Sequence, residues 1–340
     1  MIRKRTDYIK ERVKIYSKEL EVKKEVLSIK KIDAKNAKIK KYLESTDISV
    51  DQVNDLLEII LNSLLSKIIV YSLKKLANGD VRTLFRMIRI ALSSGYIYPE
   101  ERRAKYNKVQ IYDFVRALML GNNIFYNPKD SFILNLFDNE DPTKEGNNLI
   151  RMRVLQAVSV FGEHVETKDV VAFMISIGYV KEDVDIVIKK FLLAGLIGSP
   201  INEPINSDIP LYDTKVNKYN VTCLRLTQCG RYYKDELIKE MRYIEEIQYA
   251  TYASKKHYDT ICSYYRMDSL SRYHGQMSVE SRFKATEKFF DYLKEQEDIE
   301  ISKVKNMGDY DKLGEPITDI LRRTYSESQS RIRLSLLDEE

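Results

Sequence analysis

The chain has 340 residues, of which 44% are hydrophobic and 31% charged, and a net charge of +5. This composition is typical of a globular protein with two or three domains, and it excludes collagen-like or largely disordered chains. No run of about 18 apolar residues occurs, and the charged start leads into an amphipathic pattern, so we expect a cytoplasmic protein without a membrane partner. Three cysteines without paired metal-ligand spacing predict ordinary thiols, with neither a disulfide framework nor a zinc site.

The first 41 residues carry an excess of positive charge on a helical pattern. They contain fifteen Lys or Arg and six Asp or Glu. Apolar residues recur at helical spacing, at Ile9, Val13, Tyr16 and Leu20. The pattern predicts a basic amphipathic helix, either with a solvated face or with a surface that binds phosphate or a partner. Because no capping residue precedes Ile2, we expect the chain to be the C-terminal part of a longer protein.

Apolar periodicity next predicts a small helical domain that completes the first expected domain, residues 1–120. One helix ends at Asn78-Gly79, which is a common sequence at the C-terminal cap of a helix. A second helix begins at Asp80, and a third ends at Gly121. Residues 121–148 are rich in Asn, Asp, Pro and Gly, which predicts a linker to the next domain.

The second domain is expected over residues 149–230, with the order helix, helix, helix, strand, long loop, strand. Each helix shows apolar residues at helical spacing and ends at a glycine, and short strands are predicted near 196–197 and 221–226. This order predicts a winged helix-turn-helix with a small β wing. Residues 231–340 are predicted to form a C-terminal helical bundle with a polar tail from Ser326. The predicted fold is therefore mainly α.

Sequence motifs for catalysis are missing. The chain has no Gly-x-x-x-x-Gly-Lys-Ser/Thr loop to hold phosphates and no Gly-x-Ser-x-Gly nucleophile turn. None of its three histidines is four residues from another, so no two-histidine metal site lies on one helix. We therefore predict that the chain is not an enzyme by itself and holds no metal or cofactor of its own.

Two motifs resemble parts of known ATPases. The segment Asn78-Gly79-Asp80-Val81-Arg82 resembles the second-sensor helix in the lid of AAA+ ATPases, and Leu226-Thr227-Gln228-Cys229-Gly230 resembles the exit from the wing of winged helices. A winged helix follows a helical lid in origin-initiator-like AAA+ ATPases and in many STAND-type ATPases, including prokaryotic defence proteins. The resemblance covers about residues 50–237, and it lacks the nucleotide-binding core of those families.

The resemblance implies a non-catalytic lid and winged-helix module that couples the nucleotide state of a core elsewhere to a protein or DNA partner. In such a module Arg82 would reach the terminal phosphate of ATP bound to that core, because a guanidinium matches phosphate oxygens bidentately. The implied cofactor is ATP, held outside this chain. The resemblance does not decide whether the chain forms an oligomer.

Charge decides whether the predicted winged helix contacts double-stranded DNA. The first turns of its third helix carry Glu182, Asp183 and Asp185, which repel phosphates. The basic candidates for partner binding are Lys181, Lys189, Lys190, Lys215, Lys218, Arg225 and Arg231. Two alternatives therefore remain: a free-standing winged-helix DNA-binding regulator that also uses the basic N-terminal segment, and a purely structural adaptor.

Overall fold

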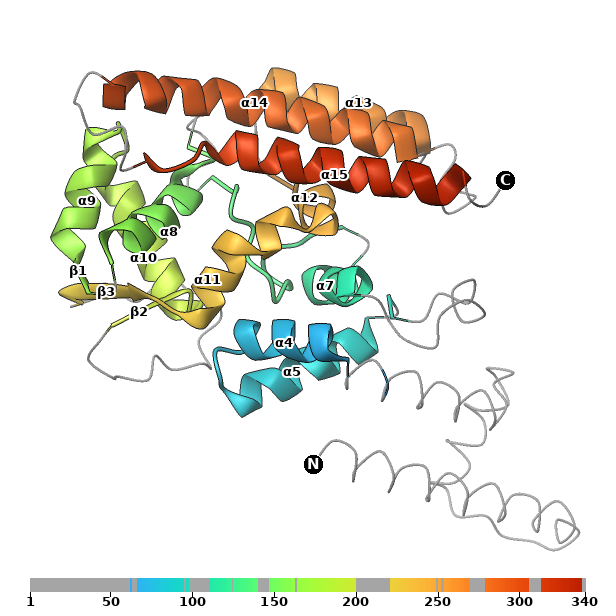
Figure 1. Ribbon diagram of the computed structural model, residues 1–340, viewed down its shortest axis with the longest axis horizontal. Helices are drawn as coiled ribbons and strands as arrows, with labels where there is room; N and C mark the ends of the chain where they lie inside the picture. The colour runs from blue at the N-terminus through green and yellow to red at the C-terminus, as the bar shows by residue number, and fades with distance from the viewer. Residues whose placement is uncertain are drawn as a thin grey trace, which may run out of the picture. The chain divides into compact units, whose positions relative to one another are not determined.

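The computed structural model describes residues 62, 66–94, 96–97, 111–123, 125–139, 147–162, 164–199, 221–248, 250–251, 254–269, 279–305 and 313–337. The predicted basic helix within residues 1–41 lies outside these ranges. The described residues form eleven α-helices, one short 3-10 helix and a small three-stranded antiparallel sheet, which confirms the prediction of a mainly α fold (Figure 1). Over the same residues, no helix combines the length and the apolar character that a membrane crossing requires.

Two compact units divide the chain. One comprises Met1–Tyr71 and Tyr98–Ile111, and the other comprises Ser72–Ile97 and Tyr112–Glu340. Most described residues belong to the second unit, and the packing described below lies within it.

The helices near the start of the described chain are α4 (Lys67–Leu76), α5 (Val81–Ser93) and α7 (Ile111–Leu120). Asn78 and Gly79 follow α4 with φ angles of 50° and 83°. This left-handed conformation is the one that asparagine and glycine tolerate best, so the pair reverses the chain without strain. The prediction that a new helix starts after Asp80 is confirmed.

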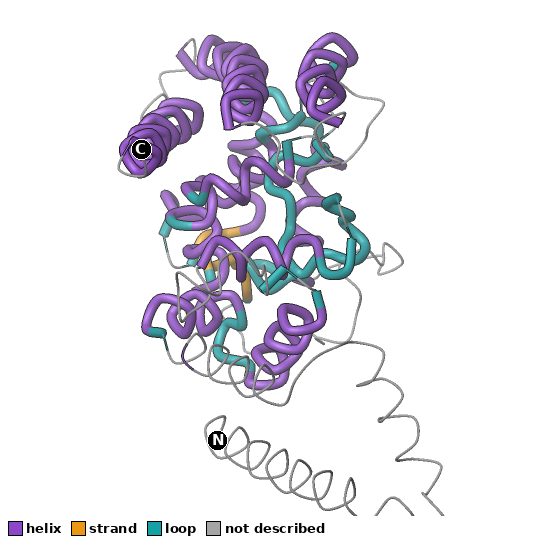
Figure 2. Tube along the Cα trace, turned by 90° about the vertical axis from the view of Figure 1, so that its right-hand side faces the viewer, coloured by secondary structure: helices purple, strands orange, loops and turns teal. Residues whose placement is uncertain are grey.

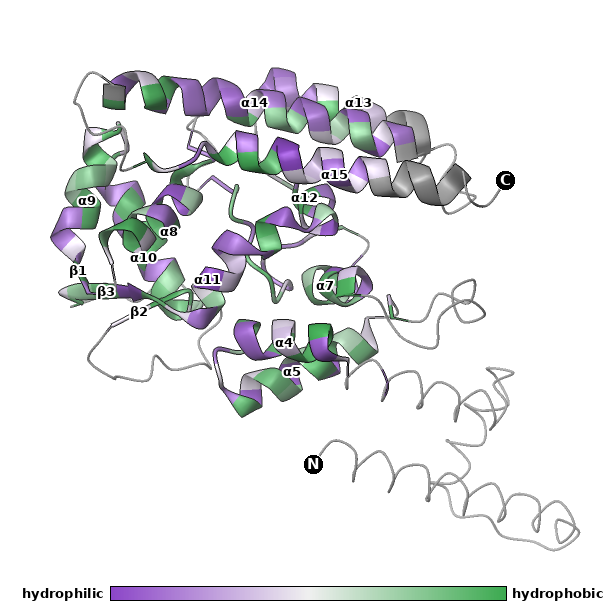
Figure 3. Ribbon diagram, viewed as in Figure 1, coloured by the Kyte–Doolittle hydropathy of each residue, from purple (hydrophilic) through white to green (hydrophobic). Residues whose placement is uncertain are grey.

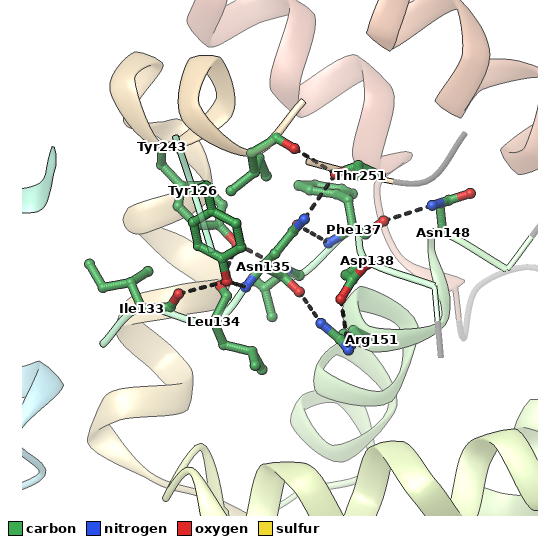
Figure 4. A network of polar contacts seen from close by, with 12 residues as sticks. Tyr126, Ile133, Leu134, Asn135, Phe137, Asp138, Asn148, Arg151, Tyr243 and Thr251 are labelled. Atoms are coloured by element: carbon green, nitrogen blue, oxygen red, sulfur yellow. Dashed lines mark hydrogen bonds and ion pairs between the residues drawn. The ribbon is translucent and has the colours of Figure 1, made fainter. Parts of the chain in front are cut away.

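A segment within the predicted linker is buried although it has no regular secondary structure. Ile133, Leu134, Leu136 and Phe137 are each at most 1% exposed. Burial of such a segment requires partners for its backbone N–H and C=O groups, because an unpaired buried polar group is costly. Side chains supply these partners, as Figure 4 shows.

Tyrosine hydroxyls satisfy much of this backbone. The Leu134 N–H donates to the hydroxyl of Tyr233 at 2.9 Å, and the Leu136 N–H donates to the hydroxyl of Tyr243 at 2.7 Å. Tyr243 donates in turn to the Leu134 carbonyl at 2.9 Å. The two tyrosines come from helices that follow the segment by about 100 residues, so the contacts hold the predicted linker in the interior of the second unit.

Asn135 is the centre of the polar network in Figure 4. Its side-chain amide donates to the Thr251 hydroxyl at 2.9 Å and accepts from the Phe137 N–H at 2.8 Å. The buried Arg151 guanidinium donates to the Asn135 carbonyl and lies 3.4 Å from a carboxylate oxygen of Asp138. A polar residue in a core is tolerated when its donors and acceptors are paired, and here the pairing fixes the path of the segment.

The following region, which we call the helix–sheet region, alternates helices with very short strands. Its elements are α8 (Ile150–Phe161), β1 (Val165–Glu166), α9 (Thr167–Ser176), α10 (Lys181–Leu193), β2 (Ile197–Gly198) and β3 (Cys223–Leu226). The strand order is β1-β3-β2, with both pairs antiparallel. Strand β1 was not predicted, because two residues are too few to show the alternation of a strand.

The Leu-Thr-x-x-Gly sequence has a structural explanation at the end of β3. Thr227 accepts a hydrogen bond from the Gly230 N–H at 3.0 Å and so caps the next helix, while its hydroxyl donates to the Gly195 carbonyl at 2.6 Å. Gly230 packs directly against the backbone of Leu196. Thr227 and Gly230 therefore hold the helix that follows β3 against Gly195 and Leu196, the residues just after α10.

The remaining helices follow β3 in close succession. They are α11 (Gln228–Asp235), the 3-10 turn η1 (Leu237–Lys239), α12 (Met241–Ile247), α13 (Lys255–Ser269), α14 (Val279–Lys305) and α15 (Ile317–Leu337). The long helix α14 lies between α13 and α15, and Figure 2 views the three nearly end on. Figure 3 shows hydrophilic and hydrophobic residues along all three, as in amphipathic helices. Residues from Ser326, predicted as a polar tail, form the second half of α15.

A buried charge cluster joins these helices to the helix–sheet region. We call Arg153, Tyr179, Glu297 and Glu300 the Arg153 cluster. The Arg153 guanidinium pairs with Glu297 and with Glu300, each at 2.7 Å, and its side chain is 1% exposed. Tyr179 donates its hydroxyl hydrogen to Glu300. Burial raises the pKa of Tyr179 well above its ordinary value, so its hydroxyl remains a donor at neutral pH.

Glu297 also fixes the start of α15. Its carboxylate accepts hydrogen bonds from the N–H groups of Ile317 at 2.7 Å and Thr318 at 3.1 Å. A negative charge at a helix N-terminus pairs with N–H groups that have no partner inside the helix. One carboxylate therefore links α8, through Arg153, to the first turn of α15.

Replacing Arg153 should destabilise the fold strongly. In Arg153→Met, Glu297 and Glu300 stay buried without their cation, and we expect the free energy of unfolding to fall by about 3–5 kcal/mol in a urea titration. The control is Arg322→Met, because Arg322 is exposed and pairs with Asp291 on the surface at 2.7 Å. Its loss should cost less than about 1 kcal/mol. Equal losses for the two variants would contradict a dominant role for the buried cluster.

Gly230 offers a second test of the fold. An added Cβ would clash with the Leu196 carbonyl oxygen and lie 2.8 Å from Cδ1 of Leu226. We expect Gly230→Ala to lower stability by about 1–3 kcal/mol or more, because the backbone has to move. Gly198→Ala is the matched control, since its Cβ would meet only ordinary contacts, the nearest at 3.5 Å. Thermal unfolding of both variants compares them directly, and similar melting temperatures would argue against the close packing.

Candidate functional site

Arg82 lies in the first turn of α5, where the preceding residue Asp80 fixes the start of the helix. The Asp80 carboxylate accepts hydrogen bonds from the N–H groups of Arg82 at 3.1 Å and Thr83 at 2.9 Å. A hydrogen bond from the Thr83 side chain is the main cause that lowers the pKa of the Asp80 carboxyl, and the nearby Arg82 charge lowers it further. The Arg82 side chain is exposed. Its guanidinium is therefore held on a well-anchored turn and accessible to an anion.

Two further arginines follow on the same side of α5. Arg86 and Arg89 are exposed like Arg82, and the three stand at the i, i+4, i+7 spacing of one helix face. Met87, Ile88 and Ala91 are buried on the opposite side of the helix. We call Arg82, Arg86 and Arg89 the arginine face. The sequence predictions included Arg82 alone, although the same spacing was already visible in the sequence.

Helix α10 carries three of the predicted partner-binding lysines. Lys181 is exposed and forms an ion pair with Asp185 at 2.7 Å. Its charge is thus partly neutralised by an acid one turn away. Lys189 and Lys190 lie in the second half of the helix and are half-buried.

The first turn of α10 is buried on one side and exposed on the other. Asp183 is 3% exposed and accepts a hydrogen bond from the Asn147 side chain at 3.1 Å. The turn before the helix contacts α14, because Tyr179 donates to Glu300 and the Lys303 side chain lies against Gly178. A recognition helix reads bases with the residues of its first turns. In this turn Asp183 is buried, and the exposed Glu182 repels phosphates.

The other predicted partner-binding residues are distributed over several elements. Arg225 is exposed in β3, between the inward-facing Leu224 and Leu226, and Arg231 is exposed on α11. Lys215 and Lys218 lie outside the described residues. The basic candidates thus occupy α10, β3 and α11, whereas the arginine face gathers three cations on one helix.

The described part of the chain offers no candidate for a metal site. It contains no group of three His, Cys, Asp or Glu residues that could hold a metal ion. Burial raises the pKa of the Cys229 thiol to about 12, so this cysteine is a protonated packing residue. The half-exposed thiols of Cys223 and Cys262 are free.

One contact chain resembles a catalytic arrangement only superficially. The Ser254 hydroxyl lies 2.8 Å from Nδ1 of His257, and Nε2 of that histidine lies 3.5 Å from a carboxylate oxygen of Glu295. The Glu295 side chain is 63% exposed, so water competes for it and it does not hold the imidazole in one orientation. The histidine ring also packs against Tyr292 at 4.7 Å. We interpret the contacts as packing of α13 against α14.

No model of a known protein family, no curated protein and no solved structure matches this chain. The features of this chain that point to a function are the arginine face and the arrangement of the helix–sheet region.

The cap at Asp80 can be tested by hydrogen exchange. Asp80→Ala removes both hydrogen bonds to the first turn of α5, at a cost of about 1 kcal/mol. We expect the amides of Arg82 and Thr83 to exchange about fivefold faster. Asp80→Ser keeps a capping oxygen and should preserve most of the protection. Because the folded-state pKa of Asp80 is lowered, its stabilisation is present above its ordinary pKa and is lost as the pH falls through the folded value. Unchanged exchange in Asp80→Ala would contradict the cap.

Proposed function

We propose that the chain is the non-catalytic lid and winged-helix module of an AAA+ or STAND-like ATPase, and that it couples the nucleotide state of a separate core to a protein or DNA partner. The observation that carries the proposal is the exposed Arg82 guanidinium on the capped first turn of α5. A guanidinium in this position suits the terminal phosphate of a nucleotide presented by another domain or chain. The described part of the chain offers a sensor for ATP, and the ATP site itself belongs to the core.

The helix–sheet region supports the winged-helix part of the proposal. Its order is helix, strand, helix, helix, strand, strand, and its third strand pairs with both others. This is the arrangement expected of a winged helix. The Thr227 cap and the close packing of Gly230 are consistent with the wing exit that the sequence resembles.

The contacts of α10 favour this proposal over a free-standing DNA-binding regulator. Such a regulator needs an accessible first turn on its recognition helix. Here Asp183 is buried against Asn147, and the preceding turn packs on α14. The exposed Glu182 of this turn would also repel the phosphates of DNA. We therefore propose that the winged helix acts as a rigid connector between the lid and the C-terminal helices.

The test requires a core with a phosphate-binding loop, sought in the same reading frame or in an adjacent one and produced together with this chain. We expect Arg82→Ala to reduce ATP hydrolysis by the assembly at least about tenfold, because a charge-assisted hydrogen bond contributes about 1.5–3 kcal/mol. Arg322→Ala, at an exposed arginine paired with Asp291, is the control and should leave the rate unchanged.

Two results would overturn the proposal. One is that no chain or segment with a phosphate-binding loop associates with this protein. The other is that Arg82→Ala hydrolyses ATP at the rate of the unmodified assembly. Either result would leave the structural adaptor as the better explanation, provided that the variant retains its circular dichroism spectrum.

A further inference from the structure

We infer that the arginine face of α5 is a docking surface for the sugar-phosphate backbone of double-stranded DNA. The three guanidiniums are exposed on one face of a single helix. They occupy positions one and two helical turns apart, so they span about 10 Å along the helix axis. Phosphates of one DNA strand follow one another at about 3.4 Å along the duplex axis. The face can therefore contact several successive phosphates at once.

The charge of this face is not neutralised locally. Asp80 is the one acidic residue in the sequence from Lys67 to Ser93, and its carboxylate is occupied by the N–H groups of the first turn. Among the described residues, no ion pair involves Arg82, Arg86 or Arg89. The surface of α14 differs, because three of its lysines pair with acids on the same helix. These pairs are Lys284 with Glu280, Lys288 with Asp291, and Lys294 with Asp298.

The chemistry of the face favours a phosphate backbone over a protein. Protein interfaces have an apolar and aromatic centre, in which lysine and acidic residues are depleted although arginine is enriched. The helix positions that continue the face toward its end are Arg86, Arg89 and the exposed Ser93, with no large apolar residue among them. Guanidiniums pair bidentately with phosphate oxygens, and Ser hydroxyls also donate to phosphates. Binding of this kind positions the protein on DNA and does not depend on base sequence.

The inference goes beyond the proposed function, because the contacts of Arg86 and Arg89 with DNA require no ATPase core. Arg82 binds either the DNA backbone or the terminal phosphate of ATP, and not both at once. It rests on the proposed function in one respect only: of the two partners named there, protein or DNA, it assigns DNA to α5. Arg86 and Arg89 separate the two ideas. They lie one and two turns beyond Arg82, so they can be replaced while the proposed nucleotide sensor stays in place.

The experiment measures the anisotropy of a fluorescent duplex of mixed sequence, titrated with the full chain at salt concentrations between 50 and 200 mM. We expect Arg86→Gln/Arg89→Gln to bind more weakly than the unmodified chain at 50 mM salt. Each lost phosphate contact lowers the dependence of log affinity on log salt by about 0.9. The variant loses two such contacts. When the salt rises fourfold, the factor by which affinity falls should therefore be about ten times smaller for the variant than for the unmodified chain.

Two variants serve as controls. Lys288→Gln/Lys294→Gln changes the net charge equally but removes lysines that are already paired, so it should keep the affinity and the salt dependence. Arg86→Lys/Arg89→Lys keeps the charges and should keep most of the salt dependence. Circular dichroism and urea unfolding establish that each variant is folded.

Three outcomes would overturn the inference: no binding of duplex by the unmodified chain at 50 mM salt, an equal effect of the paired-lysine control, or equal displacement of the duplex by polyglutamate. The last would point to an acidic protein as the partner. Failure here leaves the ATP proposal intact, because Arg82 is unchanged in these variants. Conversely, DNA binding that depends on Arg86 and Arg89, together with ATP hydrolysis that is insensitive to Arg82, would retain this inference and reject the proposed function.

Discussion

The buried Arg153 guanidinium is the interaction on which the arrangement of the second unit depends. It pairs with two carboxylates of α14, and these also accept hydrogen bonds from Tyr179 and from the start of α15. A cation so fully removed from water is tolerated only with such partners, because the cost of desolvating the charges has to be offset by their pairing. Helices α8, α14 and α15 and the turn before α10 are therefore fixed relative to one another by Arg153 and its two glutamate partners.

The buried segment around Asn135 adds a second constraint on the same unit. Its backbone polar groups pair with Tyr126, Tyr233, Tyr243 and Arg151. Four side chains from separate parts of the sequence therefore have to be in place before the segment can be buried without penalty. Tyrosine suits three of these positions, since it combines a large apolar surface with one hydroxyl.

Local sequence signals predicted the helices well and the long-range contacts poorly. The helix starts at Asp80 and Thr227 could be predicted because a cap is formed by residues that are close in sequence. The burial of Asn135 could not, because its partners, such as Thr251, lie more than 100 residues away and polar composition alone suggests a loop. Arg153 was not singled out for the same reason. The spacing of Arg86 and Arg89 from Arg82 is visible in the sequence, but their exposure on one helix face is known only from the structure.

The surroundings of the charged residues explain why α5, and not α10, is the proposed functional surface. At Arg153 the charge is completely used in holding helices together, so substitution there would report on folding. On α10 the acidic first turn is held by Asn147, and Lys181 is paired with Asp185. The guanidiniums of α5 have neither role, and exposed charges that stabilise nothing internally are the ones available to a ligand. A helix that is buried on one side through Met87 and Ala91 presents them on a rigid support, which lowers the entropy lost when a phosphate binds.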